Sequence, residues 1–464
     1  MISRIGVRIA SAFRAIVPDP FVLAILLTIL TAILALAFGR FPSDEGAATP
    51  AWAALLDAWL SSDGLWKFLA FGMQMCLVLV TGHALASSPL VHRGITALAS
   101  RPRTTAQAAA LIGLCACAAA LVNWGLGLIV GALLARDVGR SMKQRGVRAH
   151  YPLLAAAGYT GLLVWHGGLS GSAPLSVTTA EGASRVLPAA SMAEFGAGIP
   201  LGATLFSPLN LVVSGGLLIL VPLVLAALAP AADADVQECP IDRAPVDRPV
   251  EAPVGAQTIG ERLETAPWLA WILAAMLIAA FVRYAQTHGV GRIGLNEINA
   301  AMLALGLVFH GSLRSYVAAV EEGARGCAGI ILQFPLYGGI MAMMVAGGLV
   351  SMFVGGIVSI GSETTTPLLM FVSAGVVNLF VPSGGGQWGI QGPIALEAGS
   401  ILGIAPGKMV MAVAYGDELT NMLQPFWALP LLAITGVKAR DIVGYTAIVM
   451  VVAGAWMGLW LLVL

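Results

Sequence analysis

The chain has 464 residues, of which 58% are hydrophobic and only 10% are charged, and its formal net charge at pH 7 is zero. This composition excludes a water-soluble globule and is typical of a membrane protein with many spans. The neutral charge balance gives no reason to expect a nucleic acid as a partner. The five cysteines are scattered and show no disulfide framework or metal-binding spacing.

Apolar stretches long enough to cross a bilayer recur along the whole chain, since a spanning helix needs about 20 apolar residues. The first, 19–38, lacks a small-residue cleavage site, so we expect a retained helix rather than a removed signal peptide. The predicted fold class is an all-α polytopic membrane protein with about 11 membrane segments, hairpins included. The stretches lie near residues 19–38, 65–86, 105–134, 151–177, 206–229, 267–285, 295–312, 326–347, 365–398, 409–434 and 441–464.

Two of these stretches are predicted to be re-entrant helical hairpins. Stretch 105–134 has arginines at both ends and a break at Asn123-Trp124-Gly125-Leu126-Gly127, so it enters and leaves the membrane on one side. Stretch 365–398 is broken at residues 382–386 and fits a second hairpin entering from the opposite side. Such hairpins are tolerated only where protein or a water-filled cavity surrounds them.

The distribution of positive charge predicts the topology, because short cytoplasmic loops are enriched in lysine and arginine. It places the N-terminus in the cytoplasm and the C-terminus in the periplasm. The two halves become inverted repeats of five elements, each with a hairpin and a broken helix, an architecture of alternating-access carriers. Of the 24 lysines and arginines, this topology places only six on the periplasmic side of the membrane, namely Arg40, Lys67, Arg185, Arg283, Arg292 and Lys408. The predicted parts are an N-terminal repeat (1–229, with hairpin 105–134 and broken helix 151–177), a cytoplasmic linker (230–266), a connecting helix (267–285) and a C-terminal repeat (295–464, with hairpin 365–398 and broken helix 409–434).

The hairpin tips are the predicted substrate site. A helix that restarts after a glycine turn presents unpaired N–H groups and a positive dipole end, which suits a carboxylate. The alternative is that these glycines only allow close helix packing, as small residues do in membrane bundles. The candidate substrate-binding residues are Asn123, Trp124, Gly125, Gly127, Ser170, Ser172, Ser383, Gly384, Gly385, Gly386, Gln387 and Trp388.

The broken spans supply the candidate ion-coupling residues, Asp417, Glu418, His166 and Asn421. A charge at the bilayer centre costs about 2.5–3.5 kcal/mol, so Asp417 and Glu418 need a functional explanation. Adjacent residues point about 100° apart on a helix, so one acid is expected to face the cavity and the other a neighbouring helix. The alternatives are acids at headgroup level and a histidine that is simply a hydrogen-bonded core residue.

The whole chain resembles the bacterial short-chain fatty acid transporters, which are distant kin of ion-coupled carboxylate carriers with inverted repeats. This resemblance implies uptake of small monocarboxylates such as butyrate or acetoacetate across the inner membrane. The hairpin tips depart from the Ser-Asn-Thr pattern of those kin, which argues against a direct transfer of their sodium sites. The resemblance is carried by Pro18-Asp19-Pro20, Leu69-Ala70-Phe71-Gly72-Met73-Gln74-Met75, Thr81-Gly82-His83-Ala84-Leu85-Ala86, Asn123-Trp124-Gly125, Val381-Pro382-Ser383-Gly384-Gly385-Gly386 and Gln424-Pro425-Phe426-Trp427-Ala428-Leu429-Pro430.

The resulting hypothesis places the substrate carboxylate between the two tips and its acyl tail against Trp124, Trp165 and Trp388. Importing a lone anion into a negative cell costs about 2.3 kcal/mol per 100 mV, so a proton or sodium ion is expected to travel with it. A sodium ion would lie near Asn123 or Ser383; no other cofactor is expected, and a homodimer is plausible. The alternatives are a dicarboxylate or other organic-anion carrier and a passive anion channel. An enzyme is not predicted, because no HExxH, GxSxG or nucleotide-binding motif is present.

Overall fold

The computed structural model describes residues 20–41, 50–187, 189–230, 236–240, 258–379 and 383–464. Within these residues every regular element is a helix, which confirms the all-α class. The helices long and apolar enough to cross a membrane are Leu69–Ala86, Thr105–Val122, Pro208–Ala227, Pro267–His288, Leu313–Ala346 and Ala439–Val463. Most of the predicted linker lies outside the described residues, as do residues 380–382, the last of which begins the predicted second break.

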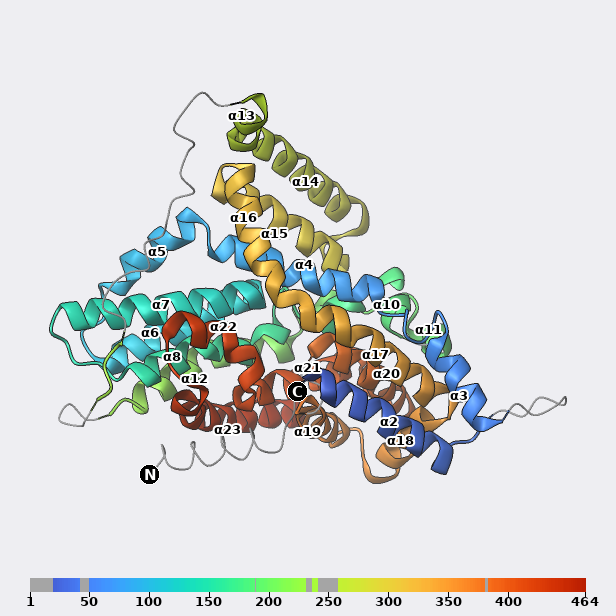
Figure 1. The fold of residues 1–464 in the computed structure, drawn as a ribbon. Helices are drawn as coiled ribbons and strands as arrows, with labels where there is room; N and C mark the ends of the chain where they lie inside the picture. The colour runs from blue at the N-terminus through green and yellow to red at the C-terminus, as the bar shows by residue number, and fades with distance from the viewer. Residues whose placement is uncertain (1–19, 42–49, 188, 231–235, 241–257, 380–382) are drawn as a thin grey trace.

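The described elements follow one another as helices joined by short turns (Figure 1). In the N-terminal half they are α2 (Pro20–Phe38), α3 (Ala51–Leu60), α4 (Leu69–Ala86), α5 (Pro89–Ala99), α6 (Thr105–Val122), α7 (Trp124–Gln144), α8 (Tyr151–Tyr159), η1 (Thr160–Leu163), η2 (Trp165–Gly167), α9 (Ser172–Ser176), α10 (Ala180–Val186), α11 (Ala189–Phe195), η3 (Leu201–Ala203) and α12 (Pro208–Ala227). In the C-terminal half they are α13 (Ile259–Thr265), α14 (Pro267–His288), η4 (Val290–Arg292), α15 (Leu295–His310), α16 (Leu313–Ala324), η5 (Arg325–Cys327), α17 (Ala328–Ala346), α18 (Leu349–Ile360), α19 (Thr366–Asn378), α20 (Gly384–Ile401), α21 (Pro406–Thr420), η6 (Asn421–Leu423), α22 (Pro425–Thr435) and α23 (Ala439–Val463).

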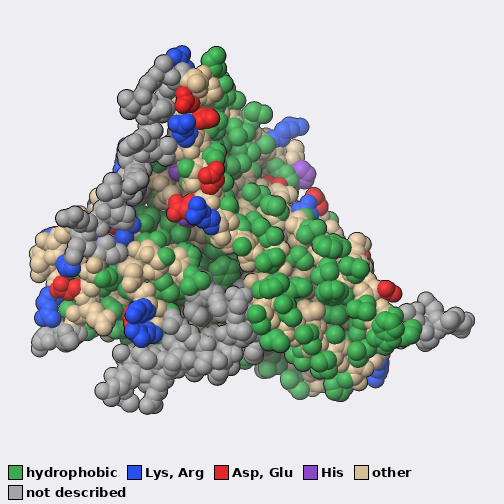
Figure 2. Space-filling view, in the orientation of Figure 1, with side chains coloured by type: hydrophobic (Ala, Val, Ile, Leu, Met, Phe, Trp, Pro, Cys, Tyr) green, Lys and Arg blue, Asp and Glu red, His purple; other side chains and the backbone are tan. Residues whose placement is uncertain are grey.

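Helix α4 crosses the middle of the molecule, with α7 packed on one side and α17 on the other (Figure 1). A broad hydrophobic surface covers α2, α3 and α17, whereas charged side chains gather near the ends of α5 and α7 (Figure 2). On this surface Ile29, Ile33 and Ile331 are each more than half exposed. An apolar surface of this extent is expected where a polytopic protein meets lipid.

Both glycine-rich breaks begin a new helix with a side-chain cap. Asn123 separates α6 from α7 and its side chain accepts a hydrogen bond from the N–H of Leu126 at 3.0 Å. Ser383 precedes α20 and its hydroxyl accepts from the N–H of Gly386 at 3.3 Å. Capping of this kind satisfies one of the free N–H groups of a helix start, so both tips are fixed starting points for helices.

Helix α7 continues ten residues beyond the predicted end of the first hairpin, to Gln144. The apolar pattern ends near Leu134, but the helix continues, and its last turn carries the basic residue Lys143, which is favourable near a helix C-terminus. Arg136 and Arg140 both lie close to Asp137, at 2.8 and 3.7 Å. A change in hydropathy therefore marked the end of the apolar region rather than the end of the helix.

The two broken spans meet at their breaks. The first consists of α8, η1, η2 and α9, and the second of α21, η6 and α22. The hydroxyl of Tyr159 donates to the carbonyl oxygens of Asn421 and Gln424, at 3.0 and 2.9 Å, within the second break. This contact satisfies carbonyl groups freed where the helix is interrupted, as irregular backbone at membrane depth requires.

Glycine allows close approach of α7, the second helix of the first hairpin, and α8, the first helix of the first broken span. A Cβ on Gly131 would lie 2.1 Å from the carbonyl oxygen of Gly158, and a Cβ on Gly158 would lie 2.5 Å from that of Gly131. Small residues commonly replace side-chain interdigitation at membrane helix contacts. This close contact places the first hairpin beside the first broken span.

Candidate functional site

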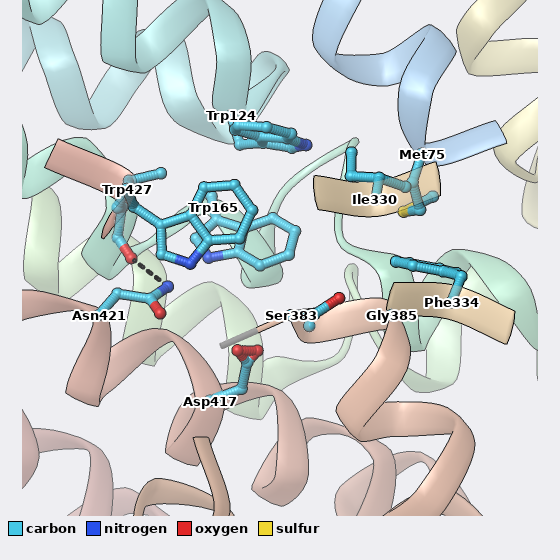
Figure 3. A pocket seen from close by; sticks show the side chains of 12 residues that line it. Met75, Trp124, Trp165, Ile330, Phe334, Ser383, Gly385, Asp417, Asn421 and Trp427 are labelled. Atoms are coloured by element: carbon cyan, nitrogen blue, oxygen red, sulfur yellow. Dashed lines mark hydrogen bonds between the residues drawn. The ribbon is translucent and has the colours of Figure 1, made fainter. Parts of the chain in front are cut away.

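A small cavity lies at the centre of the molecule, where the tips of both hairpins meet both broken spans (Figure 3). It holds about 450 Å³ of space free of atoms, part of it open to solvent, so it accommodates only a small ligand. The lining residues are Met75, Trp124, Leu162, Trp165, Ile330, Phe334, Ser383, Gly384, Gly385, Asp417, Asn421 and Trp427.

The N-terminus of α20 forms one wall of this cavity. Ser383 is the cap, and Gly384 and Gly385 are the first two helical residues. The first N–H groups of a helix have no acceptor within that helix and carry partial positive charge. Because glycine leaves them uncovered, this wall is suited to an anion.

Asp417 of α21 points into the cavity toward this helix start (Figure 3). Its side chain is buried, and its Oδ2 atom has no hydrogen-bond partner in the described part of the chain. A Cβ placed on Gly384 would lie only 2.9 Å from that atom. The carboxylate therefore occupies the same region that a bound anion would use.

His166 of η2 lies on the other side of Asp417, with its Nδ1 atom 3.4 Å from Oδ2, a separation within ion-pair distance although the two atoms make no hydrogen bond. The N–H of Ala173 donates to Nε2 at 3.0 Å, and the Ser172 hydroxyl lies 2.9 Å from the same atom. Since Nε2 accepts a hydrogen bond, the ring proton of the neutral imidazole is on Nδ1. The first broken span therefore directs an N–H group at the acid of the second.

Glu418 faces away from the cavity, so the two adjacent acids have different surroundings. Its Oε2 atom accepts from the backbone N–H of His166 at 2.8 Å, and its side chain is completely buried. Asn421 lines the cavity, donates to the Leu162 carbonyl at 3.4 Å and accepts from Asn378 at 2.9 Å. Glu418 thus links the two broken spans, whereas Asp417 is available to a ligand.

Indole rings form the apolar wall opposite the α20 tip. Trp124 packs against both Trp165 and Trp427, with ring centroids 6.3 and 5.4 Å away in edge-to-face arrangements. Trp165 also stacks on His166 at 4.2 Å. Met75 and Phe334 close the other side (Figure 3). A ligand with a charged head and a short apolar tail matches this division.

Comparisons with known proteins agree with this geometry. The family model described as "Short chain fatty acid transporter" matches residues 1–464. The chain is 38% identical over 458 residues to a protein of Escherichia coli K12, covering 98% of this chain and 97% of that protein. A protein of Haemophilus influenzae is 35% identical over 445 residues, covering 96% of each chain. Both carry the name "Putative short-chain fatty acid transporter".

The chain belongs to the short-chain fatty acid transporter family. The resemblance in its sequence motifs is therefore confirmed.

Two solved transporters share the fold. The Alcanivorax borkumensis YdaH transporter superposes with a TM-score of 0.58 at 17% identity, covering 96% of this chain and 98% of that one. Neisseria gonorrhoeae MtrF, which represents a class of antimetabolite efflux pumps, gives 0.57 at 16% identity, covering 98% and 97%. At these identities the likeness establishes the fold alone.

In this family member the residues predicted at the first tip do not all reach the cavity. Trp124 lines it, but Gly125 packs against Leu79 and Gly127 against Ala120. Ser170 accepts a hydrogen bond from the N–H of Trp124 at 2.9 Å and so supports that residue from behind. Ser172 contacts His166 instead of the cavity.

The second tip contributes more directly than the first, through Ser383, Gly384 and Gly385. The other predicted residues of this tip face protein. A Cβ on Gly386 would lie 2.3 Å from Tyr337, Gln387 donates to the Ala374 carbonyl at 2.8 Å, and Trp388 is fully buried outside the cavity. Trp427 lies where the hypothesis placed Trp388.

Four lining residues were not predicted, namely Met75, Leu162, Ile330 and Phe334. They are ordinary apolar residues in apolar stretches, and nothing in their spacing separates a cavity wall from a helix contact. Trp427, which follows the polar break of the second broken span, was a candidate from the sequence for the wall of an apolar pocket, and it lines the cavity.

Asn123 is expected to act in stability, because its side chain is fully engaged within the protein. Its amide donates to the Val78 carbonyl at 3.1 Å, and its oxygen caps α7. Asn123→Ala removes a helix cap and the buried hydrogen bond to Val78, changes that together typically cost about 1–3 kcal/mol. We expect a thermal unfolding midpoint several degrees lower.

Thermal unfolding of the purified protein in detergent, followed by tryptophan fluorescence, measures this effect. Asn123→Ser is the matched control, because it keeps a neutral capping oxygen and loses the donor to Val78. A full-stability Asn123→Ala protein that no longer binds substrate would instead assign Asn123 to the site.

Proposed function

We propose that this family member takes up short-chain monocarboxylates such as butyrate or acetoacetate across the inner membrane, together with a proton or a sodium ion. The observation that carries the proposal is the pairing of a buried acid, Asp417, with the free start of α20 in one small cavity. The substrate carboxylate binds the N–H groups of Gly384 and Gly385. Its acyl tail lies against Trp124, Trp165 and Trp427.

The charge of the cavity supports a monocarboxylate over a dicarboxylate. Among its described lining residues there is no lysine or arginine, and Asp417 is the only acid. A second substrate carboxylate would have no cationic partner there, and an unpaired buried charge is strongly unfavourable. The small volume likewise favours a short acid.

Cation coupling follows from the same arrangement. A substrate carboxylate at Gly384 would lie beside the Asp417 carboxylate, and two like charges in one buried site are not both ionised without compensation. A proton on Asp417 or a sodium ion between the two oxygens removes this repulsion. Substrate binding then requires the cation, which is the condition for symport.

Alternating access is supported by the order of the elements. Each half contains a hairpin (α6 with α7, α19 with α20) followed by a broken span, and the second helix of each hairpin packs on the broken span of the other half (α7 on α22, α20 on α9). This exchange fits two inverted repeats, as in the proposed division 1–229 and 295–464. We propose a cytoplasmic N-terminus and a periplasmic C-terminus, and a homodimer as the assembly.

Reconstituted transport tests the function. The purified protein in liposomes is given labelled butyrate under an imposed proton gradient or, separately, a sodium gradient, with empty liposomes measuring passive permeation. We expect saturable accumulation above equilibrium with one of the two gradients. Uptake that never exceeds equilibrium would indicate a passive channel, and no saturable uptake would contradict the monocarboxylate assignment. Accumulation of butyrate that requires the cation gradient to be imposed in the opposite direction would indicate efflux. Efflux is the direction of transport in the class of pumps that MtrF represents.

A further inference from the structure

A second cavity lies on the far side of α4 from the indole rings. It holds about 460 Å³ of space free of atoms, and its lining is far more polar than that of the central cavity. It is formed between α4, α9, α10, α14 and the start of α15. Its described lining residues are Phe71, Gln74, Leu175, Ser176, Thr179, Glu181, Gly182, Arg185, Tyr284, Gly294, Leu295, Asn296 and Glu297.

This second cavity reaches the protein surface and contains charges of both signs. Glu181 is paired with Arg185 and its side chain is 73% exposed. Glu297 accepts a hydrogen bond from the N–H of Gly294 at 2.9 Å, and Gln74 donates to Asn296 at 2.7 Å. These charged and amide side chains make the second cavity a polar space, in contrast to the mostly apolar central cavity.

The side chain of Phe71 contacts residues of both cavities. It lines the second cavity, and its ring lies edge-to-face on Phe334, a residue of the central cavity, with centroids 5.7 Å apart. A Cβ on Gly385, at the tip of α20, would lie 3.0 Å from its Cε1 atom. Phe71 is only 1% exposed. On the same helix, Gln74 faces the second cavity and Met75 the central one.

We propose that Phe71 is the barrier between the central cavity, where substrate binds, and the polar second cavity. We further propose that its ring limits the length of the acyl chain that the central cavity accepts. This inference rests on the proposed function, because it takes the central cavity as the substrate site. The barrier is a single ring held against the α20 tip, so a displacement of that tip away from α4 opens it. Until then, the ring closes the space beyond Phe334 into which a longer tail would extend.

The first test compares ligand preference in Phe71→Ala and the wild type. Competition of acetate, butyrate, hexanoate and octanoate against labelled butyrate is measured on protein in detergent, where membrane permeation plays no part. Truncation frees the volume of the phenyl ring between Phe68 and Phe334, where two further methylene groups of the tail are removed from water, so we expect hexanoate to gain at least about tenfold in affinity relative to butyrate, equivalent to about 1.4 kcal/mol. Phe71→Leu, which keeps part of the bulk, is expected to fall between.

Phe68→Ala is the matched control. Phe68 lies three residues earlier, is fully buried and contacts the Phe71 ring at 6.2 Å, but it lines neither cavity. It loses the same ring without joining the two spaces, so its chain-length preference is expected to match the wild type. An unchanged preference in Phe71→Ala, or an equal shift in Phe68→Ala, would overturn the proposal.

The second test does not depend on substrate. Met75→Cys is introduced into a protein whose five native cysteines are replaced by alanine, and a membrane-impermeant thiol reagent is applied from the side of Arg185. We expect labelling to be at least about tenfold faster when Phe71→Ala is added, because the ring no longer blocks the path. Equal labelling with and without the ring would contradict the barrier. If the wild type transports butyrate and both tests fail, this inference is wrong while the proposed function stands; if the wild type neither binds nor transports butyrate, the proposed function itself fails.

Discussion

Asp417→Asn is expected to abolish concentrative butyrate uptake while preserving exchange of butyrate across the membrane. Asparagine has nearly the shape of a protonated aspartate but neither takes up nor releases a proton. The transporter would therefore remain in its substrate-binding form, able to carry butyrate in both directions and unable to return empty. We expect net uptake to fall by at least about tenfold, or about 1.4 kcal/mol.

Paired assays in liposomes measure this prediction: gradient-driven uptake, and exchange of labelled for unlabelled butyrate without a gradient. Glu418→Gln is the matched control, because Glu418 is the neighbouring buried acid but accepts a hydrogen bond from His166 rather than lining the cavity. It is expected to lower thermal stability and leave the ratio of uptake to exchange unchanged. Concentrative uptake by Asp417→Asn would remove Asp417 from the coupling mechanism, and loss of exchange as well would point to a sodium ligand.

Gly384→Ala is expected to weaken butyrate binding by at least about tenfold, or about 1.4 kcal/mol, without unfolding the protein. The added methyl group would lie 2.7 Å from Cη2 of Trp165 and 2.9 Å from Oδ2 of Asp417. These distances are shorter than carbon contacts allow, so the Asp417 side chain or the indole must move. The methyl group also covers the N–H groups that are proposed to bind the substrate carboxylate.

Equilibrium binding of labelled butyrate in detergent, with thermal unfolding as the measure of folding, checks this result. Gly375→Ala is the control within the same hairpin, since a Cβ there would meet its nearest neighbours at an ordinary 3.4 Å. Wild-type affinity in a folded Gly384→Ala protein would show that the substrate carboxylate binds away from the α20 tip.

The helical framework was largely accessible from the sequence. The apolar stretches gave the class and most of the long helices, and the two glycine breaks marked the starts of α7 and α20. Helices of mixed composition were less visible: α5 and α16 lie in segments read as loops, and the apolar α18 (Leu349–Ile360) fell between two predicted spans. Helix formation at such places depends on caps and on neighbouring helices, which a hydropathy pattern does not register.

The chemistry of the site was predictable by residue type, whereas its spatial assignment was not. Polar residues inside apolar stretches are costly, so Asp417, Glu418 and His166 stood out from the sequence alone. Asn123, Gln387 and Trp388 stood out equally, yet the structure uses them to bind or fill other parts of the protein. A polar side chain at membrane depth needs some partner, and only the fold decides whether that partner is protein or ligand.

The sequence by itself determined the membrane class, the places where helices break and the acids available for coupling, because each follows from transfer free energies and local backbone preferences along the chain. The tertiary structure decided which acid faces the cavity, which indoles line it and that Phe71 lies between two cavities. These depend on the rotation of each helix and on contacts between residues hundreds of positions apart, such as His166 with Asp417. Neither the rotation of a helix nor a contact between distant residues can be read from the pattern of one segment, because packing against neighbouring helices determines which face of a helix is buried.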